Sequence, residues 1–242
     1  MKNLHLKNLV TLLLGIGSCQ SNMVCGATVF QNLNFEEATV PDLPSGSWNS
    51  SEPVADALPG WRAFIGTFEV TTVPHNAHPF GAVSVIIYGP YSWSSDILSG
   101  NYSAGLAGAY YYQPEFRNAS IAQVGAVPMW ANSIQFKVSP WAHAFTVSLG
   151  GNVLPTQQLS STAQYLIWAA DVSAYAGNET ELRFTSMYDG LGPPNLISLD
   201  DIQFSTDMVP EPSALALGCT GGLVCWRAVR RKNKASIPHG TE

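Results

Sequence analysis

Short runs in which apolar and polar side chains alternate recur along the chain between residues 28 and 208. In residues 134–138, isoleucine, phenylalanine and valine alternate with Gln135 and Lys137. A period of two places one face of a strand in a core and the other in water. Residues 83–88 are instead apolar almost throughout, as a central strand is. No segment of this region has the helical period of about 3.6 residues, so the pattern predicts an all-β fold.

About ten strands are predicted, each bounded by glycine, proline, asparagine or serine. They are expected at residues 28–35, 61–73, 83–88, 104–112, 120–127, 133–139, 144–149, 164–169, 181–187 and 197–205. The proline-marked polar segment 41–59 is expected to be a loop. Strands at this spacing favour a two-sheet antiparallel β-sandwich of the jelly-roll type. We expect residues 28–208 to form one domain, because no internal repeat interrupts them.

The first residues have the features of an export signal. Lys2 and Lys7 precede an apolar stretch at residues 9–17, and a Cys-Gly-Ala sequence ends at Ala27. This order is typical of a signal peptide, which we expect at residues 1–27 with cleavage after Ala27. As an alternative, residues 16–19 resemble a lipobox, which would place a lipid on Cys19.

The last residues combine a rigid segment, an apolar run and a basic end. Residues 209–213 read Val-Pro-Glu-Pro-Ser, residues 214–226 carry no charge, and basic residues follow. The prolines exclude a strand interior or a helix interior. A membrane span needs roughly 20 apolar residues, and basic residues stay on its cytoplasmic side. A hydrophobic transmembrane helix is therefore predicted, the alternatives being a buried core helix or a disordered end.

This tail resembles the PEP-CTERM sorting signal of exported bacterial proteins, although its polar end, residues 233–242, is longer than usual. The resemblance rests on Val209, Pro210, Glu211 and Pro212 and on Arg227, Arg230, Arg231 and Lys232. It implies a sorting tail at residues 209–242, read by an exosortase-type membrane enzyme. It also implies a protein that is anchored in the membrane at the cell envelope or released outside the cell.

Charge and cysteine distribution narrow the functions of residues 28–208. This region has fifteen acidic and only four basic side chains, so it has no patch for phosphate groups and no nucleic-acid partner is expected. All four cysteines lie outside it. The mature domain is therefore predicted to have neither a disulfide nor a thiol nucleophile, and to depend on its core and, if one is bound, on a metal.

Four segments of the domain resemble the galactose-binding-like jelly rolls found among carbohydrate-binding modules. They are Asn-Leu-Asn-Phe-Glu at 32–36, Leu-Pro-Gly-Trp at 58–61, the loop and strand at 171–184, and Leu-Asp-Asp-Ile at 199–202. The resemblance implies that the first and last strands meet, that some members hold a structural calcium there, and that extracellular polysaccharide is a candidate partner.

Glu36, Asp200 and Asp201 are the candidate calcium ligands, because Ca²⁺ takes about 6–8 oxygen ligands. A strand with period two would place Asp200 on the face of Ile202 and Phe204, and Asp201 on the other face. One carboxylate would then point inward and need a cation or backbone donors. The alternative is that it caps a turn through backbone N–H groups.

Trp93, Tyr110 and Tyr112 are the candidate glycan-binding residues, because exposed rings stack on sugar faces. In a strand, Tyr110 and Tyr112 would share one face, opposite Tyr111. The alternative is ordinary core or rim packing.

His75 and His78 lie three residues apart, but zinc needs three or four ligands and no further histidine or cysteine is near them in sequence, so no zinc site is assigned.

No hydrolase or nucleotide motif stands in the chain. Ser103 lies between Gly100 and Gly105, but the first spacing does not match Gly-x-Ser-x-Gly. We therefore expect a non-enzymatic, exported, membrane-tethered surface or matrix protein. Two alternatives stay open: a secreted glycan-active enzyme on the same scaffold, and a purely structural envelope protein.

Overall fold

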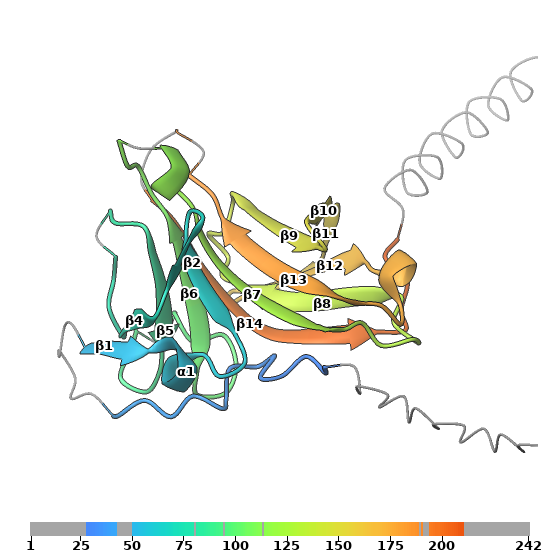
Figure 1. The fold of residues 1–242 in the computed structure, drawn as a ribbon, viewed down its shortest axis with the longest axis horizontal. Helices are drawn as coiled ribbons and strands as arrows, with labels where there is room; N and C mark the ends of the chain where they lie inside the picture. The colour runs from blue at the N-terminus through green and yellow to red at the C-terminus, as the bar shows by residue number, and fades with distance from the viewer. Residues whose placement is uncertain are drawn as a thin grey trace, which may run out of the picture.

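The structure is a computed structural model that describes residues 28–42, 50–79, 81–93, 95–112, 114–188, 190 and 194–210. These residues form two β-sheets that pack face to face (Figure 1). The predicted all-β, two-sheet architecture is therefore confirmed. Helix is confined to short turns, which are α1 (Val54–Ala57), η1 (Pro114–Phe116) and η2 (Ser173–Tyr175). Within the described residues, no helix is both long and apolar enough to cross a bilayer.

One sheet has eight strands and the other has six. The eight-stranded sheet contains, in spatial order, β1 (Ser50–Pro53), β4 (Thr72–His75), β5 (Ser84–Tyr88), β6 (Ser103–Gly108), β14 (Asn195–Ser205), β8 (Ser133–Val138), β12 (Leu166–Asp171) and β11 (Thr156–Ser161). The six-stranded sheet contains β10 (Asn152–Leu154), β9 (Phe145–Leu149), β13 (Glu179–Ser186), β7 (Ala119–Ala126), β2 (Arg62–Ile65) and β3 (Phe68–Val70). Neighbours pair antiparallel, except that β4 and β5 pair parallel through His75 and Ile87.

The core lies between the sheets, where the alternating residues of the sequence meet. Phe136 of β8 and Phe184 of β13 are buried, and their rings meet at 5.1 Å and 76°. Trp61 also packs against Phe184, and its indole N–H donates to the backbone oxygen of Asn32 over 3.0 Å. Burying a side chain of this size contributes about 2–3 kcal/mol. The Trp61 contact therefore attaches residues 28–42 to the sandwich.

Residues 28–35 do not form the predicted strand. Val29 makes one isolated bridge to Ala126, and the chain then turns at residues 32–37. Asn32 and Phe35 have positive φ values of 48° and 60°, which end any extended segment. Asn32 stabilises the turn, because its Oδ1 accepts from the N–H of Glu37 over 3.1 Å.

The bounds of other elements also differ from those expected from the sequence. The segment expected to be a loop at 41–59 contains β1 and α1, and the expected strand 61–73 divides into β2, β3 and the start of β4. The strand expected at 104–112 ends at Gly108, where a Cβ atom would lie 2.6 Å from the backbone of Met187. Tyr110, Tyr111 and Tyr112 therefore lie outside any strand, and the predicted alternation of their side chains is wrong.

An extra residue interrupts the alternation of β14 at Asp201, whose φ is 48°. Before it, Asp200 lies opposite Lys137 of β8, and after it Phe204 lies opposite Ile134 in the core. Opposed residues of an antiparallel pair point to the same side of the sheet. Asp200 therefore points to the outer face and does not share a face with Phe204, contrary to the sequence expectation. The bulge breaks the period of two on which that expectation rested.

Candidate functional site

The connection between β5 and β6, residues 89–102, crosses the outer face of the eight-stranded sheet; we call it the β5–β6 loop. Ser99 of this loop reaches two strands at once. Its N–H donates to Asp200 Oδ2 of β14 over 3.0 Å, and its Oγ accepts from Lys137 Nζ of β8 over 3.3 Å. The loop therefore covers the charged part of β14.

Asp200 is completely buried under this loop. Besides Ser99, it accepts a hydrogen bond from Ser103 Oγ over 2.7 Å and one from the N–H of Asp201 over 2.6 Å. Ser103 Oγ in turn accepts from the N–H of Leu98 over 3.0 Å. Burial outweighs these hydrogen bonds and raises the pKa of Asp200 to about 7. Asp200 thus holds both ends of the segment that runs from Ser99 to Ser103.

Glu36 holds the middle of the same segment. Its Oε1 accepts from the N–H groups of Asn101 (2.8 Å) and Tyr102 (3.0 Å), and its Oε2 accepts from Asn101 Nδ2 (3.0 Å). Gly100 approaches so closely that a Cβ atom there would lie 2.3 Å from Glu36 Oε1. The first segment of the domain and the last strand are thus brought to one loop, and both carboxylates cap backbone N–H groups.

The contacts of these carboxylates do not fit a calcium ion. The oxygens of Glu36 and Asp200 accept hydrogen bonds from N–H and O–H donors, and Asp201 Oδ2 pairs with Lys137 Nζ at 3.0 Å. An ammonium group already supplies positive charge at this point. In the part of the chain that the structure describes, no group of three or more His, Cys, Asp or Glu side chains could hold a metal ion. The turn-capping alternative is the one that these contacts support.

A third carboxylate, Asp96, lies within the β5–β6 loop and is buried. Its Oδ2 accepts from Ser92 Oγ over 3.0 Å and lies 3.2 Å from His78 Nε2. Burial raises the pKa of Asp96, and the His78 and Ser92 contacts oppose that change. Ser92 Oγ and His78 Nε2 therefore contact the same carboxylate oxygen.

The other histidine of the pair, His75, is buried at the end of β4. Its two ring nitrogens have no hydrogen-bond partner among the described residues, and burial lowers its pKa. His75 Nε2 packs so close to Gly89 that a Cβ atom there would lie 2.9 Å away. The neutral ring thus packs at the start of the β5–β6 loop.

Trp93 lies on the β5–β6 loop with 58% of its surface exposed. One face of its ring rests on His78, with 4.0 Å between ring centroids, and the remainder meets solvent. The neighbouring Tyr91 is 64% exposed and has a φ of 75°, a conformation that is an outlier for a bulky residue. The loop thus presents two aromatic rings to solvent.

Tyr110, Tyr111, Tyr112 and Tyr188 form a second aromatic surface, which we call the tyrosine patch. The Tyr111 and Tyr112 rings stack at 4.8 Å, and the Tyr110 and Tyr188 rings meet edge to face at 6.1 Å. Arg117 fixes the patch: its guanidinium lies 4.9 Å from the Tyr110 ring centroid, and its Nε donates to the backbone oxygen of Tyr111 over 2.7 Å. Tyr110 and Tyr112 are 62% and 70% exposed.

The structure does not bring Trp93 together with the tyrosine patch. β5 and β6 are antiparallel, so Tyr88 lies opposite Ser103 and Ser84 lies opposite Ala107. Trp93 follows the Tyr88 end of this pair, whereas Tyr110 follows the other end. The predicted glycan-binding residues therefore occupy two separate surfaces.

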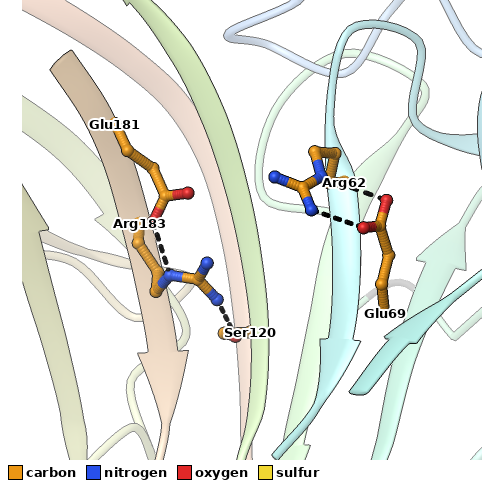
Figure 2. A network of polar contacts seen from close by, with 5 residues as sticks. All are labelled: Arg62, Glu69, Ser120, Glu181 and Arg183. Carbon is orange, nitrogen blue, oxygen red and sulfur yellow. Dashed lines mark hydrogen bonds and ion pairs between the residues drawn. The ribbon is translucent and has the colours of Figure 1, made fainter. Parts of the chain in front are cut away.

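The outward face of the six-stranded sheet carries charge that is already paired (Figure 2). Arg62 of β2 bonds Glu69 of β3, and Arg183 of β13 donates through Nε to Glu181 over 2.9 Å. Both guanidinium groups lie over the Phe64 ring, at 4.9 and 4.2 Å from its centroid. Each arginine thus has a carboxylate partner, which argues against an anion site on this face.

The predicted signal and most of the sorting tail lie outside the described residues. This applies to Ala27, Glu211, Pro212, Arg227, Arg230, Arg231 and Lys232. Val209 and Pro210 are described: they follow the end of β14 at Ser205, and Pro210 is exposed. No protein-family model matches the chain, and no curated protein matches its sequence.

Proposed function

We propose that this chain is an exported, membrane-tethered surface or extracellular-matrix protein of bacteria. Its β-sandwich, of the jelly-roll type, stands outside the cytoplasm and adheres to extracellular polysaccharide. An exosortase-type membrane enzyme reads the Pro-Glu-Pro entry of the tail, and the signal peptide directs export. The role is non-enzymatic.

The observation that carries this proposal is where Val-Pro-Glu-Pro-Ser falls in the chain. The last strand ends at Ser205, and Pro210 is exposed only five positions later. The rigid segment therefore starts directly outside the sandwich, where a processing enzyme can reach it without unfolding the domain. The apolar run and basic cluster that follow have the order that a membrane anchor requires.

The tyrosine patch supports adhesion. Three of its rings are exposed and held by Arg117 and by each other, so little side-chain entropy is lost when a ligand stacks on them. Flat, amphipathic tyrosine rings bind apolar sugar faces and donate hydrogen bonds through their hydroxyls. The strong excess of acidic residues favours uncharged polymers over acidic ones.

Replacement of Pro210, Glu211 and Pro212 by alanine tests the sorting function. In a bacterium that contains an exosortase, we expect the variant to differ from the wild type in mature mass and in cell fraction, with an unchanged unfolding temperature. Alanine at Thr206 and Asp207, in the same exposed linker, is the matched control and should be processed normally. Identical mass and location of the Pro-Glu-Pro variant and the wild type would count against the proposal.

A further inference from the structure

A groove of about 390 Å³ lies where three connections of the chain converge. It is lined by Ser95, Trp141, Ala163 and Gln164. Ser95 belongs to the β5–β6 loop, Trp141 to the β8–β9 connection, and the other two to the β11–β12 connection. The last two connections meet because Val138, the end of β8, lies opposite Leu166, the start of β12.

Hydrogen bonds fix the walls of this groove. Thr162 Oγ1 accepts from the N–H groups of Gln164 (3.2 Å) and Tyr165 (2.9 Å), which holds the β11–β12 turn. The Gln164 side chain then crosses to the β5–β6 loop, where its Nε2 donates to the Ile97 oxygen over 3.3 Å. On the side of Trp141, the N–H of Ala142 donates to the backbone oxygen of Ser139 over 3.1 Å. The site is therefore preformed, which reduces the entropy lost on binding.

The chemistry of the lining selects one class of ligand. Trp141 is 46% exposed and offers a flat apolar ring and an indole N–H, Ser95 offers a hydroxyl, and Gln164 Oε1 offers an acceptor. None of these four lining residues is charged, so among the described residues the lining offers no group that neutralises an anion or a cation. A flat apolar face next to hydroxyl and amide groups matches a pyranose ring, which has an apolar face and a rim of hydroxyls.

We propose that this groove binds one or two units of a neutral polysaccharide, with the sugar ring stacked on Trp141 and its hydroxyls bonded to Ser95 and Gln164. The volume agrees, because small-molecule sites span roughly 300–1,000 Å³. This site is distinct from the tyrosine patch and from the sorting tail. It deepens the proposed adhesion and rests on it for its ligand class, but it can exist whether or not the tyrosine patch binds a polymer or the tail is processed.

Calorimetric titration of the full chain tests this site, in a detergent without a sugar headgroup. The probes are four neutral hexasaccharides, of β-1,4-glucose, α-1,4-glucose, β-1,4-mannose and β-1,4-xylose, with an α-1,4-galacturonic acid hexamer as the charged counterpart. We expect at least one neutral hexamer to bind to the variant that has alanine at both Tyr110 and Tyr112, which removes the tyrosine patch as a second site. Trp141→Ala should weaken this binding about tenfold or more, and Gln164→Ala by a smaller factor.

An exposed ring elsewhere provides the matched control. Trp130 is exposed and precedes Ser133, at the opposite end of β8 from the groove. Trp130→Ala should bind the hexamer as the wild type does, and all variants should keep the wild-type unfolding temperature. The proposal is overturned if no neutral hexamer binds, if only the galacturonic acid hexamer binds, or if Trp141→Ala leaves the affinity unchanged.

Discussion

Ser103 donates its hydroxyl proton to the buried carboxylate of Asp200 over 2.7 Å, at the point where the β5–β6 loop returns to the sheet. The same Asp200 oxygen accepts from the N–H of Ser99. One carboxylate therefore closes the β5–β6 loop, which carries the exposed rings of Tyr91 and Trp93. Its ionisation state bears directly on how firmly that loop is held.

Stability should fall as the pH rises through the titration of Asp200. Its folded pKa of about 7 lies above the reference value of 3.8, so between these values the folded state binds more protons than the unfolded state. The stabilisation is fully present below about pH 4 and is lost as the pH approaches 7. At about 1.4 kcal/mol per pH unit, the full effect is about 4 kcal/mol. Thermal unfolding followed by circular dichroism from pH 3.5 to 8 measures it.

Asp200→Asn should flatten the dependence of stability on pH between pH 4 and 7, because the amide does not ionise. Asp201→Asn is the matched control: it changes the neighbouring carboxylate, which is partly exposed and paired with Lys137, and should leave the slope between pH 4 and 7 in place. A wild-type profile without that slope, or an Asp200→Asn profile that keeps it, would contradict the pKa assignment.

His75 should contribute a pH dependence of the opposite sign. Burial lowers its folded pKa below the reference value of 6.5, so the unfolded state binds more protons as the medium becomes acidic, and stability is lost as the pH falls below about 6.5. His75→Leu removes the two unpaired buried nitrogens, and we expect it to raise the unfolding temperature more at pH 5 than at pH 8. The same change at the exposed His143 serves as the control. An equal effect of His75→Leu at both pH values would refute this prediction.

Calcium should not change the stability of the domain. The candidate carboxylates already accept N–H and O–H donors or pair with Lys137, so a cation would have to displace these contacts. We expect equal unfolding temperatures with millimolar CaCl₂ and with EDTA. A rise in the unfolding temperature with calcium that Glu36→Gln abolishes would restore the calcium site that the sequence suggested.

The alternation of side chains predicted the core well, because burial enforces it. Phe136 and Val138 lie in the core, where the period of two places them. The same rule failed at Asp200, because one extra residue at Asp201 reverses the phase and no residue type in the sequence marks that bulge. The strand expected at residues 104–112 includes the three tyrosines, but the close approach of Gly108 to Met187 ends β6 before them.

Sequence predicts residues of the candidate site only where the residue type itself points to a role. Glu36 and Asp200 were singled out as acids on the first and last segments, and both do meet at one loop. Their role differs from the calcium role, because hydrogen-bond donors come from residues 99–103, which have no sequence signature. Trp141 and Gln164 were missed for a similar reason: connections far apart in the chain bring them together, and sequence spacing does not contain that information.

Asn76 should be among the most sensitive positions of the loop region. Its φ of 53° lies in the left-handed region, its Oδ1 accepts from the N–H of Gly89 over 2.7 Å, and its Nδ2 donates to the Pro90 oxygen over 2.9 Å. Asn76→Ala loses both hydrogen bonds and adds backbone strain, at a cost of about 2–4 kcal/mol. Asn76→Gly loses the same hydrogen bonds without the strain, so it should be about 1 kcal/mol more stable than Asn76→Ala. Urea unfolding measures both, and equal stabilities would exclude the strain contribution.

The tyrosine patch should contribute to ligand binding but not to the free energy of unfolding. Tyr110 and Tyr112 are mostly exposed, so their replacement by alanine removes little buried surface and should change the free energy of unfolding by less than about 0.5 kcal/mol. The same double replacement should weaken retention on insoluble neutral polysaccharide, because the stacking surface is lost. Arg117→Ala should weaken retention less, since it releases the rings without removing them. Val153→Ala, at an exposed apolar residue of β10, is the control, and retention equal to that of the wild type in the double variant would exclude the patch as an adhesive surface.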